Sequence, residues 1–341
     1  MKYLSLFSGI GGFELGIQQA YKSNNEHASI GEESESKERT QGRERAVDID
    51  GVQLHHRDGT APLCVGYSEI DKYATSIYQK YFPDHKNWGD ITKINEQELP
   101  DFDFLCGGFP CQSFSIAGKR GGFNDTRGTL FFDIARILKA KQPRLLLLEN
   151  VKGLLSHDQG KTFRTIISTL DELGYDLQWQ VLNSKNFGVP QNRERVFIIG
   201  HLRGEPRPEV FPFGTSNESD VRKGTLAHTL NSSDWRGPNR NQKQTTIRTD
   251  EQNSQEGRNQ SNNSNHIRRT SYTDGARIRR LTPTECERLQ GFPDGWTEKG
   301  LSRYLRMGNI VSISDTQRYK CLGNAVTVNV IQAIMEKLLT S

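Results

Sequence analysis

Along its first 200 residues, the chain alternates short apolar runs with segments whose apolar residues have helical spacing. Parallel strands need long crossover connections, which are usually helices. The alternation therefore predicts an α/β fold with a doubly wound, mostly parallel sheet, and a ligand site at the carboxyl ends of its strands. We expect strands at 3–7, 63–71, 101–108, 145–150 and 195–201, and helices that begin near 12 and span 71–82, 130–140 and 325–339.

Two polar tracts interrupt this pattern and explain why only 33% of the 341 residues are hydrophobic. Residues 23–61 hold eight hydrophobic residues in 39 positions, and residues 214–278 hold ten in 65. The remaining positions can still build a sizeable core. We expect 23–61 to be a solvated insertion, and a second, smaller domain to begin after His201, where proline and polar residues become frequent.

The net charge of +4 permits a nucleic-acid partner without requiring one. Basic residues exceed acidic residues by three in 214–278, so this tract is a better candidate than 23–61 for contacting phosphates. No stretch approaches the ~18–20 apolar residues of a membrane span, and we expect a cytoplasmic protein that does not bind membranes. The five cysteines include no CxxC pair, which argues against a disulfide framework and a metal site.

The glycine loop at 8–12 follows the first predicted strand, and two ligands compete for it. A dinucleotide fingerprint, GxGxxG, would need glycine at position 14, where the chain has Glu14. Adenosyl-methionine needs only a tight glycine turn and an acid on the next strand for its ribose hydroxyls. Glu69 ends that strand, 18 residues beyond Gly12 once the 39-residue insertion is left out. A turn without any ligand is the plain alternative.

Cys111 lies in the segment GGFPCQSFS, directly after the strand predicted at 101–108. A lone cysteine is most often a small buried hydrophobe. Here Pro110 precedes it and polar residues follow, which favours a nucleophilic thiol at the ligand-binding edge. The glycine-rich stretch downstream has the composition of a mobile basic lid, with a solvated surface loop as the alternative; its bases are Lys119, Arg120 and Arg127.

Acidic and basic residues flank two further apolar runs. Glu149 follows the run at 145–148, and an acid at the carboxyl end of a buried strand favours a role in chemistry over a role in solubility. A helix cap is the alternative. Arg193 and Arg195 would share one face of an extended strand. Two guanidinium groups on one side favour an anionic substrate or a clamped carboxylate, with a solvated strand edge as the alternative.

Nine ordered blocks make the chain resemble the cytosine-5 DNA methyltransferase family, in its prokaryotic and phage modification type. Each block is weak evidence alone, but the ordered set is specific and covers nearly everything outside the two polar tracts. The blocks are LFSGIGGFELG (6–16), EIDKYA (69–74), GDIT (89–92), GGFPCQSFS (107–115), RGTLFFDIARIL (127–138), ENVKGL (149–154), FGVPQNRERVFIIG (187–200), RRLTPTECERLQGFPDGW (279–296) and YKCLGNAVTVNV (319–330).

The resemblance implies a class I adenosyl-methionine-dependent methyltransferase domain made of residues 1–200 and 320–341, with the insertion 23–61. Residues 201–319 would then form the target-recognition domain. It also implies methyl transfer from S-adenosyl-L-methionine to carbon 5 of cytosine in a specific double-stranded DNA sequence. We expect a monomer, either solitary or paired with a restriction endonuclease that acts on the same site.

The family chemistry assigns roles to four of these residues. Carbon 5 of cytosine is a poor nucleophile, so a thiolate must first add to carbon 6, and Cys111 matches that nucleophile. Glu149 matches the acid that relieves charge at ring nitrogen 3. Arg195 matches the residue that orients cytosine and the acid, with Arg193 supporting it. The base must leave the duplex for this chemistry, as is general for DNA methyltransferases.

The family pattern also places the cofactor residues. These are Phe7 at the adenine, Gly9, Gly11 and Gly12 around the methionine part, Glu69 at the ribose, Asp90 at the adenine amino group and Asn324 near the methionine end. Asp90 and Asn324 have simple alternatives as a turn acid and a helix cap. In the recognition region, the residues that follow HTL (228–230) are the candidates for contacting DNA; they are Ser232, Trp235 and Arg236.

Two other functions remain open from the sequence. A tRNA cytosine-5 methyltransferase would share the fold, but the flanks of the Pro-Cys motif fit the DNA class better. A catalytically inert DNA-binding remnant is the second alternative, and the intact Cys111, Glu149 and Arg195 weigh against it.

Overall fold

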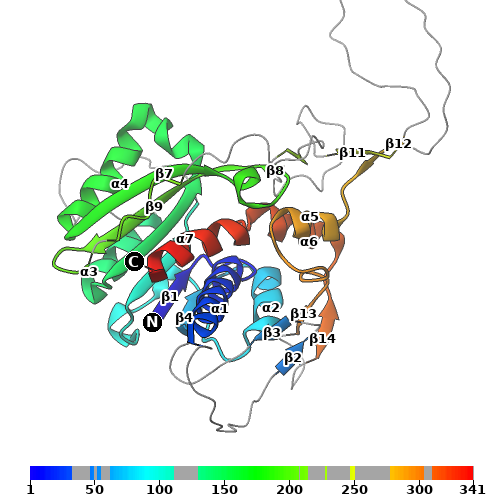
Figure 1. Ribbon diagram of the computed structural model, residues 1–341, viewed down its shortest axis with the longest axis horizontal. Helices are drawn as coiled ribbons and strands as arrows, with labels where there is room; N and C mark the ends of the chain where they lie inside the picture. Colours follow the sequence, from blue (N-terminus) through cyan, green and yellow to red (C-terminus); the bar gives the residue numbers. More distant parts are fainter. Residues whose placement is uncertain are drawn as a thin grey trace, which may run out of the picture.

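A six-stranded sheet in the order β4-β1-β5-β6-β9-β7 forms the centre of the molecule (Figure 1). The structure is a computed structural model that describes residues 1–32, 47–49, 52–54, 62–110, 130–206, 208–213, 227–228, 246–249, 277–302 and 309–340. The strands of the sheet are β1 (Lys2–Leu6), β4 (Leu63–Ser68), β5 (Phe104–Gly108), β6 (Leu145–Val151), β7 (Tyr175–Asn183) and β9 (Glu194–Leu202).

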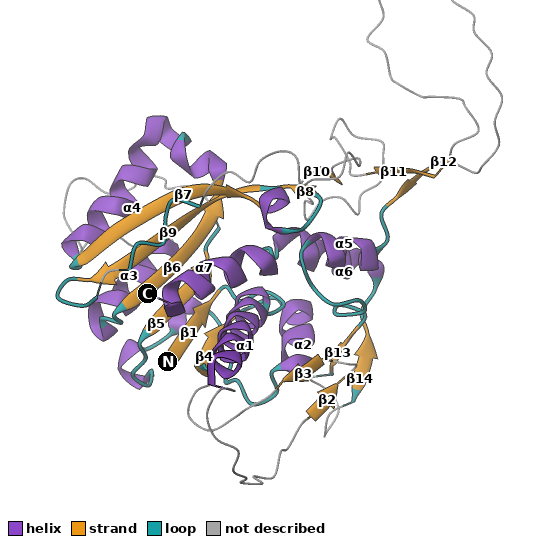
Figure 2. Cartoon of the chain, in the orientation of Figure 1, coloured by secondary structure: helices purple, strands orange, loops and turns teal. Residues whose placement is uncertain are grey.

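Helices cover both faces of this sheet, as Figure 2 shows. Alternate residues of β1, β5 and β6 pack on opposite sides, because successive side chains of a strand point to opposite faces. One face lies against α1 (Gly12–Glu32) and α7 (Val328–Thr340). The other lies against α3 (Leu130–Lys141) and α4 (Lys161–Glu172). The predicted doubly wound α/β class is confirmed.

The sheet is mixed, which the apolar runs alone did not reveal. β4, β1, β5 and β6 are parallel, whereas β9 is antiparallel to both β6 and β7. The chain returns from β7 to β9 through the 3-10 helix η6 (Ser184–Phe187) and the short strand β8 (Gln191–Asn192), and such a short connection joins antiparallel neighbours. β7 was not predicted, because this edge strand has many polar residues.

Helix α1 runs to Glu32, well past the expected start of the insertion at residue 23. Its buried residues Phe13, Ile17 and Ala20 anchor the first turns, and no proline follows to stop the helix. Within the same tract, β2 (Val47–Ile49) and β3 (Val52–Leu54) pair as an antiparallel hairpin. These parts of the tract therefore have regular structure, and the expectation that 23–61 is a solvated insertion stays a prediction.

A third hydrophobic cluster joins the C-terminal part of the chain to α2 (Lys72–Tyr81). Trp296 stacks on Tyr81 with ring centroids 3.6 Å apart. Inside this part, Arg318 forms a 3.1 Å ion pair with the fully buried Glu287. The elements here are α5 (Pro283–Leu289), β13 (Lys299–Leu301), β14 (Ile310–Ser312) and α6 (Asp315–Asn324).

The predicted recognition region, 201–319, includes α5, β13 and β14 and three further short strands. β10 (Ala227–His228) pairs in parallel with β8, and β11 (Thr246–Thr249) pairs antiparallel with β12 (Arg277–Arg280). The expected boundaries of that region, 201 and 319, stay a prediction.

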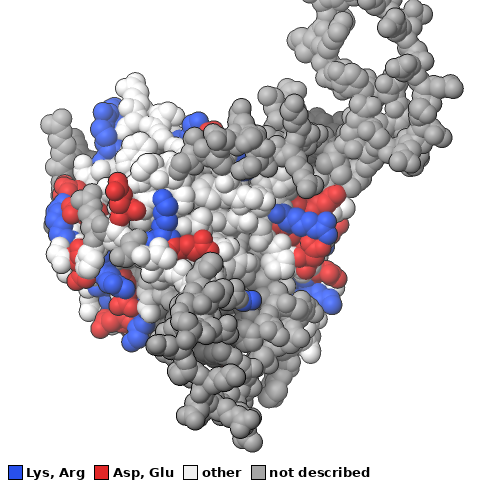
Figure 3. All heavy atoms as spheres, in the orientation of Figure 1, with Lys and Arg blue, Asp and Glu red and all other residues white. Residues whose placement is uncertain are grey.

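The described helices include none with the length and apolar character needed to cross a membrane. On the face in Figure 3, the coloured Lys and Arg side chains are interspersed with Asp and Glu. The described residues of this face therefore form no patch of a single charge.

Candidate active site

The predicted site residues come from loops at one edge of the sheet. The glycine loop follows β1, Glu69 follows β4, and Phe109 follows β5, while Glu149 lies near the end of β6. These four strands are parallel, so their carboxyl ends meet at the same edge. The fold thus brings together segments that are far apart in the sequence.

Glu69 is held in place by three backbone N–H groups. Its Oε2 accepts from Gly9 N at 2.9 Å, and its Oε1 accepts from Ile70 N at 2.8 Å and Asp71 N at 2.7 Å. Burial raises the pKa of Glu69, while the hydrogen bonds from Asp71 and Gly9 partly lower it. This carboxylate is fixed against the glycine loop, where an acid could accept from two hydroxyls of a sugar.

The three predicted glycines of the loop have different reasons to be glycine. Gly9 has φ 58°, and a Cβ there would meet no atom within 4 Å among the described residues. Gly11 has φ 91°, and its Cβ would lie 2.6 Å from the Phe82 ring. A Cβ on Gly12 would lie 2.8 Å from Val326 Cγ1. The space beside Gly9 suits a close ligand approach, whereas Gly11 and Gly12 are required by packing.

The remaining predicted cofactor residues lie at the end of β1, at a 3-10 helix after β4 and at the end of α6. Phe7 is half-buried with φ 54°, a conformation that is uncommon outside glycine. Asp90 caps the 3-10 helix η1 (Ile91–Lys93), and its Oδ1 accepts from Thr92 N at 3.0 Å and Thr92 Oγ1 at 2.8 Å. These bonds lower the pKa of Asp90. Asn324 is exposed at the end of α6.

Glu149 and Arg195 form an ion pair, with Arg195 Nε 3.0 Å from Glu149 Oε1. Their side chains are 12% and 15% exposed, so solvent screens the pair only partly. Arg195 stands opposite Val151 in the ladder between β6 and β9, which places it diagonally across from Glu149 on the same face. The clamped carboxylate expected from the sequence is therefore observed for Arg195 alone, because the Arg193 guanidinium binds backbone carbonyls instead.

Gly108 leaves room for the Glu149 carboxylate. The two residues are register partners in β5 and β6, and a Cβ on Gly108 would lie 2.9 Å from Glu149 Oε2. A larger residue at 108 would therefore displace the acid. The sequence showed the glycine pair before Phe109, but not which side chain needs the space.

Asn150 ties the end of β6 to the loop that leads to Cys111. Its Nδ2 donates to the carbonyl of Phe109 at 2.8 Å, and its Oδ1 accepts from Val151 N at 2.8 Å. Asn150 is 2% exposed, so these bonds are shielded from water. Asn150 was not among the predicted site residues, although its position beside Glu149 was a possible signal.

Arg193 points away from solvent, toward the connection between α6 and α7. It is 3% exposed, and its Nη2 donates to Ala325 O at 2.8 Å and to Gly323 O at 3.3 Å. Burial and the neighbouring Arg195 lower the pKa of Arg193 to about 9, so the group stays cationic at neutral pH.

Two further residues near the glycine loop were missed. Ile70 is 72% exposed directly after Glu69, and an apolar side chain so exposed beside a candidate site can serve as a ligand contact. Trp296 Nε1 donates to Ile10 O at 2.9 Å and holds the loop from behind. Only the apolar character of Ile70 beside an acid was visible in the sequence.

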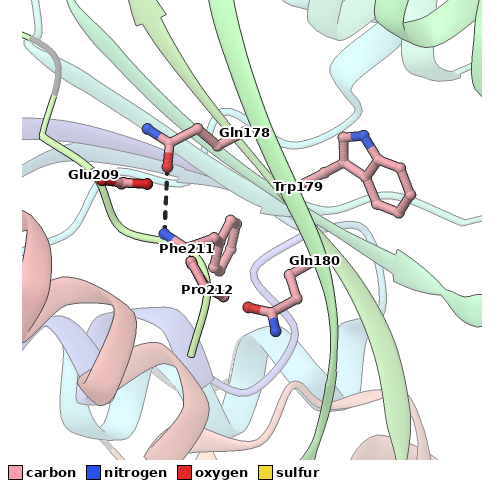
Figure 4. A pocket seen from close by; sticks show the side chains of 6 residues that line it. All are labelled: Gln178, Trp179, Gln180, Glu209, Phe211 and Pro212. Carbon is pink, nitrogen blue, oxygen red and sulfur yellow. Dashed lines mark hydrogen bonds between the residues drawn. The ribbon is translucent and has the colours of Figure 1, made fainter. Parts of the chain in front are cut away.

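A cavity elsewhere on the molecule is lined by none of the predicted site residues (Figure 4). It lies where residues 208–213 cover β7. Gln178 Oε1 accepts from Val210 N at 3.1 Å and from Phe211 N at 3.3 Å. Gln180 Oε1 accepts from Phe213 N at 2.8 Å. The side-chain oxygens of Gln178 and Gln180 are thus already hydrogen-bonded to backbone N–H groups, so we interpret the cavity as a gap in the packing between β7 and residues 208–213.

Seven predicted site residues lie outside the described residues. They are the candidate nucleophile and the candidate DNA contacts, namely Cys111, Lys119, Arg120, Arg127, Ser232, Trp235 and Arg236.

Comparisons with known proteins agree with the resemblance. The family model for the C-5 cytosine-specific DNA methylase matches residues 51–340. The chain is 41% identical to the Type II methyltransferase M.SsoII of Shigella sonnei, over 88% of this chain and 81% of that protein. It is 36% identical to the Type II methyltransferase M.NlaX of Neisseria lactamica, over 99% of this chain and 96% of that protein.

Solved structures support the fold. The S. pombe Dnmt2 methyltransferase superposes with a TM-score of 0.62 at 17% identity, covering 100% of this chain and 98% of that one. A putative DNA modification methyltransferase encoded within an E. coli prophage gives a TM-score of 0.55 at 18% identity, covering 100% and 99%.

Proposed function

Because this chain belongs to the C-5 cytosine-specific DNA methylase family and is therefore a DNA cytosine-5 methyltransferase, we propose that it transfers the methyl group of S-adenosyl-L-methionine to cytosine within one specific duplex sequence. The ion pair of Glu149 with Arg195, beside the segment that leads to Cys111, is the observation that carries this proposal. It provides an oriented acid where cytosine chemistry needs one.

The proposed mechanism uses three side chains. The Cys111 thiolate adds to carbon 6 of a flipped-out cytosine, and Glu149 supplies a proton or a hydrogen bond at ring nitrogen 3. Arg195 orients Glu149 through the observed ion pair, and its remaining N–H groups can donate to the base. Bound adenosyl-methionine supplies the electrophilic methyl group that carbon 5 then takes. A base removes the carbon 5 proton, and the bond between sulfur and carbon 6 breaks.

The residues around the glycine loop fit adenosyl-methionine. Glu69 would accept from the ribose hydroxyls, and the open space beside Gly9 would allow close approach of the cofactor. Phe7 would contact the adenine, Asp90 its amino group, and Asn324 the methionine end. Gly11 and Gly12 would shape the loop, because both are closely packed from behind.

We propose that DNA is bound by the basic segment with Lys119, Arg120 and Arg127, and is read by Ser232, Trp235 and Arg236. The pairing of β10 with β8 supports a recognition region close to Arg193. Because 281–302 and 309–319 include parts that pack against α2 and the glycine loop, we place the sequence-reading part between 214 and 280. The relatives of this chain that are named Type II methyltransferases favour a companion restriction endonuclease that acts on the same DNA site. A monomer acting on DNA in the cytoplasm fits this role.

The decisive experiment incubates the purified protein with methyl-labelled adenosyl-methionine and either duplex DNA or tRNA, followed by sequencing of the modified product. We expect label at carbon 5 of cytosine in one DNA sequence. Cys111→Ser should abolish transfer while cofactor binding survives, because a hydroxyl is a far weaker nucleophile near neutral pH. DNA carrying 5-fluorocytosine should trap a covalent adduct that depends on Cys111. Labelled tRNA, or no label in either substrate, would contradict the proposal.

A further inference from the structure

The position of Arg193 suggests a role other than contact with cytosine. Its guanidinium group bridges the carbonyls of Gly323 and Ala325, which are the residues on either side of Asn324. The backbone of Arg193 is itself fixed, because its N–H donates to Asn183 Oδ1 at 3.1 Å and its carbonyl accepts from Ser184 N at 3.0 Å. The guanidinium is therefore held rigidly against the α6–α7 connection.

This connection forms part of the wall behind the glycine loop. Val326, two residues after Asn324, contacts the position of Gly12 so closely that a Cβ there would lie 2.8 Å away. Asn324 is exposed, whereas Gly323 and Ala325 on either side are buried. A buried cation bound to both neighbouring carbonyls limits the backbone freedom of Asn324 and so fixes the direction of its Cα–Cβ bond. Cations near a helix C-terminus are also favoured by the helix dipole.

We propose that Arg193 is a positioning residue that fixes Asn324 for the methionine end of adenosyl-methionine. This inference rests on the proposed function, because it assumes that cofactor and that place for Asn324. The segment 193–195 then serves both halves of the reaction. Arg193 acts on the cofactor side through Asn324, and Arg195 acts on the cytosine side through Glu149.

The test measures adenosyl-methionine binding by calorimetry without DNA, and kcat and KM with DNA. Arg193→Gln should raise the cofactor Kd about tenfold, as expected for the loss of one oriented hydrogen bond to a charged ligand, and should raise the cofactor KM similarly. The KM for DNA should stay unchanged. Arg193→Lys keeps a cation that can reach one carbonyl, so its Kd should rise less. Arg195→Lys should lower kcat with the cofactor Kd unchanged.

A double-mutant cycle separates positioning from general damage to the fold. Asn324→Ala should raise the cofactor Kd, and adding Arg193→Gln or Arg193→Lys should raise it no further. Tyr319→Phe is the matched control, because it removes the hydrogen bond from the Tyr319 hydroxyl on α6 to the Leu281 carbonyl without touching Arg193 or either of its two carbonyl partners. We expect it to leave the cofactor Kd unchanged.

Three outcomes overturn the inference, and they are distinguishable. If the wild-type protein binds no adenosyl-methionine, the proposed function fails and the inference fails with it. If the wild type binds the cofactor and methylates DNA, but Arg193→Gln and Arg193→Lys bind the cofactor as well as the wild type, only the inference fails. Additive losses in the cycle would overturn it too, because Arg193 would then act independently of Asn324.

Discussion

Glu14 is a fully buried carboxylic acid in α1, and we predict that it makes stability depend on pH. Its side chain is fully buried, and both carboxylate oxygens are shielded from solvent. Burial raises its pKa from the ordinary 4.5 to about 7, and the nearby Ser5 hydroxyl lowers it only in part. Glu14 is therefore protonated more readily in the folded state than in the unfolded state.

The sign of the effect follows from proton binding. Between pH 4.5 and about 7 the folded protein binds more protons at Glu14 than the unfolded chain does, so stability falls as pH rises through this window. The complete loss, reached above pH 7, is about 3 kcal/mol. At pH 5 only about 1 kcal/mol of it has been lost, because that pH lies just half a unit above the ordinary pKa of 4.5, where the loss begins.

The substitution Glu14→Gln removes the titration and keeps the shape of the side chain. Relative to the wild type, Glu14→Gln should raise the free energy of unfolding by about 2 kcal/mol more at pH 8 than at pH 5. Urea titrations followed by circular dichroism at both pH values measure it. The packing cost of the amide is the same at both pH values, so it cancels.

Glu172→Gln, at an exposed position at the end of α4, is the matched control and should leave the pH dependence unchanged. A gain from Glu14→Gln that is equal at pH 5 and pH 8 would refute the reasoning. It would mean that Glu14 keeps its charge in the folded protein and has solvation that the structure does not show.

Three further predictions test the site. In the native protein, an alkylating reagent should modify Cys111 alone, because the other four cysteines are buried, namely Cys64, Cys106, Cys286 and Cys321. Intact mass and peptide mapping measure the labelling, and rapid labelling of a second thiol would contradict this. Gly108→Ala should lower kcat by about 10- to 100-fold by displacing Glu149, with the melting temperature little changed, and an unchanged kcat would show that the acid tolerates the shift. Lys320→Met removes the partly exposed ion pair with Asp71 and should lower the free energy of unfolding in urea by at most about 1 kcal/mol; a larger loss would show that the pair is shielded from solvent.

The core strands could be predicted from the sequence, and so could the placement of Glu69 and Glu149 at the same edge of the sheet, because the carboxyl ends of parallel strands meet there. An acid that directly follows an apolar strand is placed at that edge whatever the distant packing is. The same rule brought the glycine loop and the segment after β5 to the site. For these residues, local pattern and chain direction were sufficient.

Contacts that depend on packing between distant segments were not accessible. Arg193 binds carbonyls 130 and 132 residues further along the chain, and no local pattern reports such a pairing. The alternation rule placed Arg193 beside Arg195 but could not reveal its partner. β7 and the extension of α1 were missed for a related reason, since edge strands and polar helix ends have weak apolar patterns.

The glycine loop shows how the two kinds of information combine. From the sequence its glycines indicate a ligand, yet only Gly9 borders open space, while Gly11 is packed against Phe82 and Gly12 against Val326. Trp296 then fixes the loop backbone at Ile10. Because Val326 and Trp296 both come from the C-terminal part of the chain, that part forms the rear wall of the loop. In the sequence, the segment 214–280, which we propose reads DNA, lies between β9 and this C-terminal part.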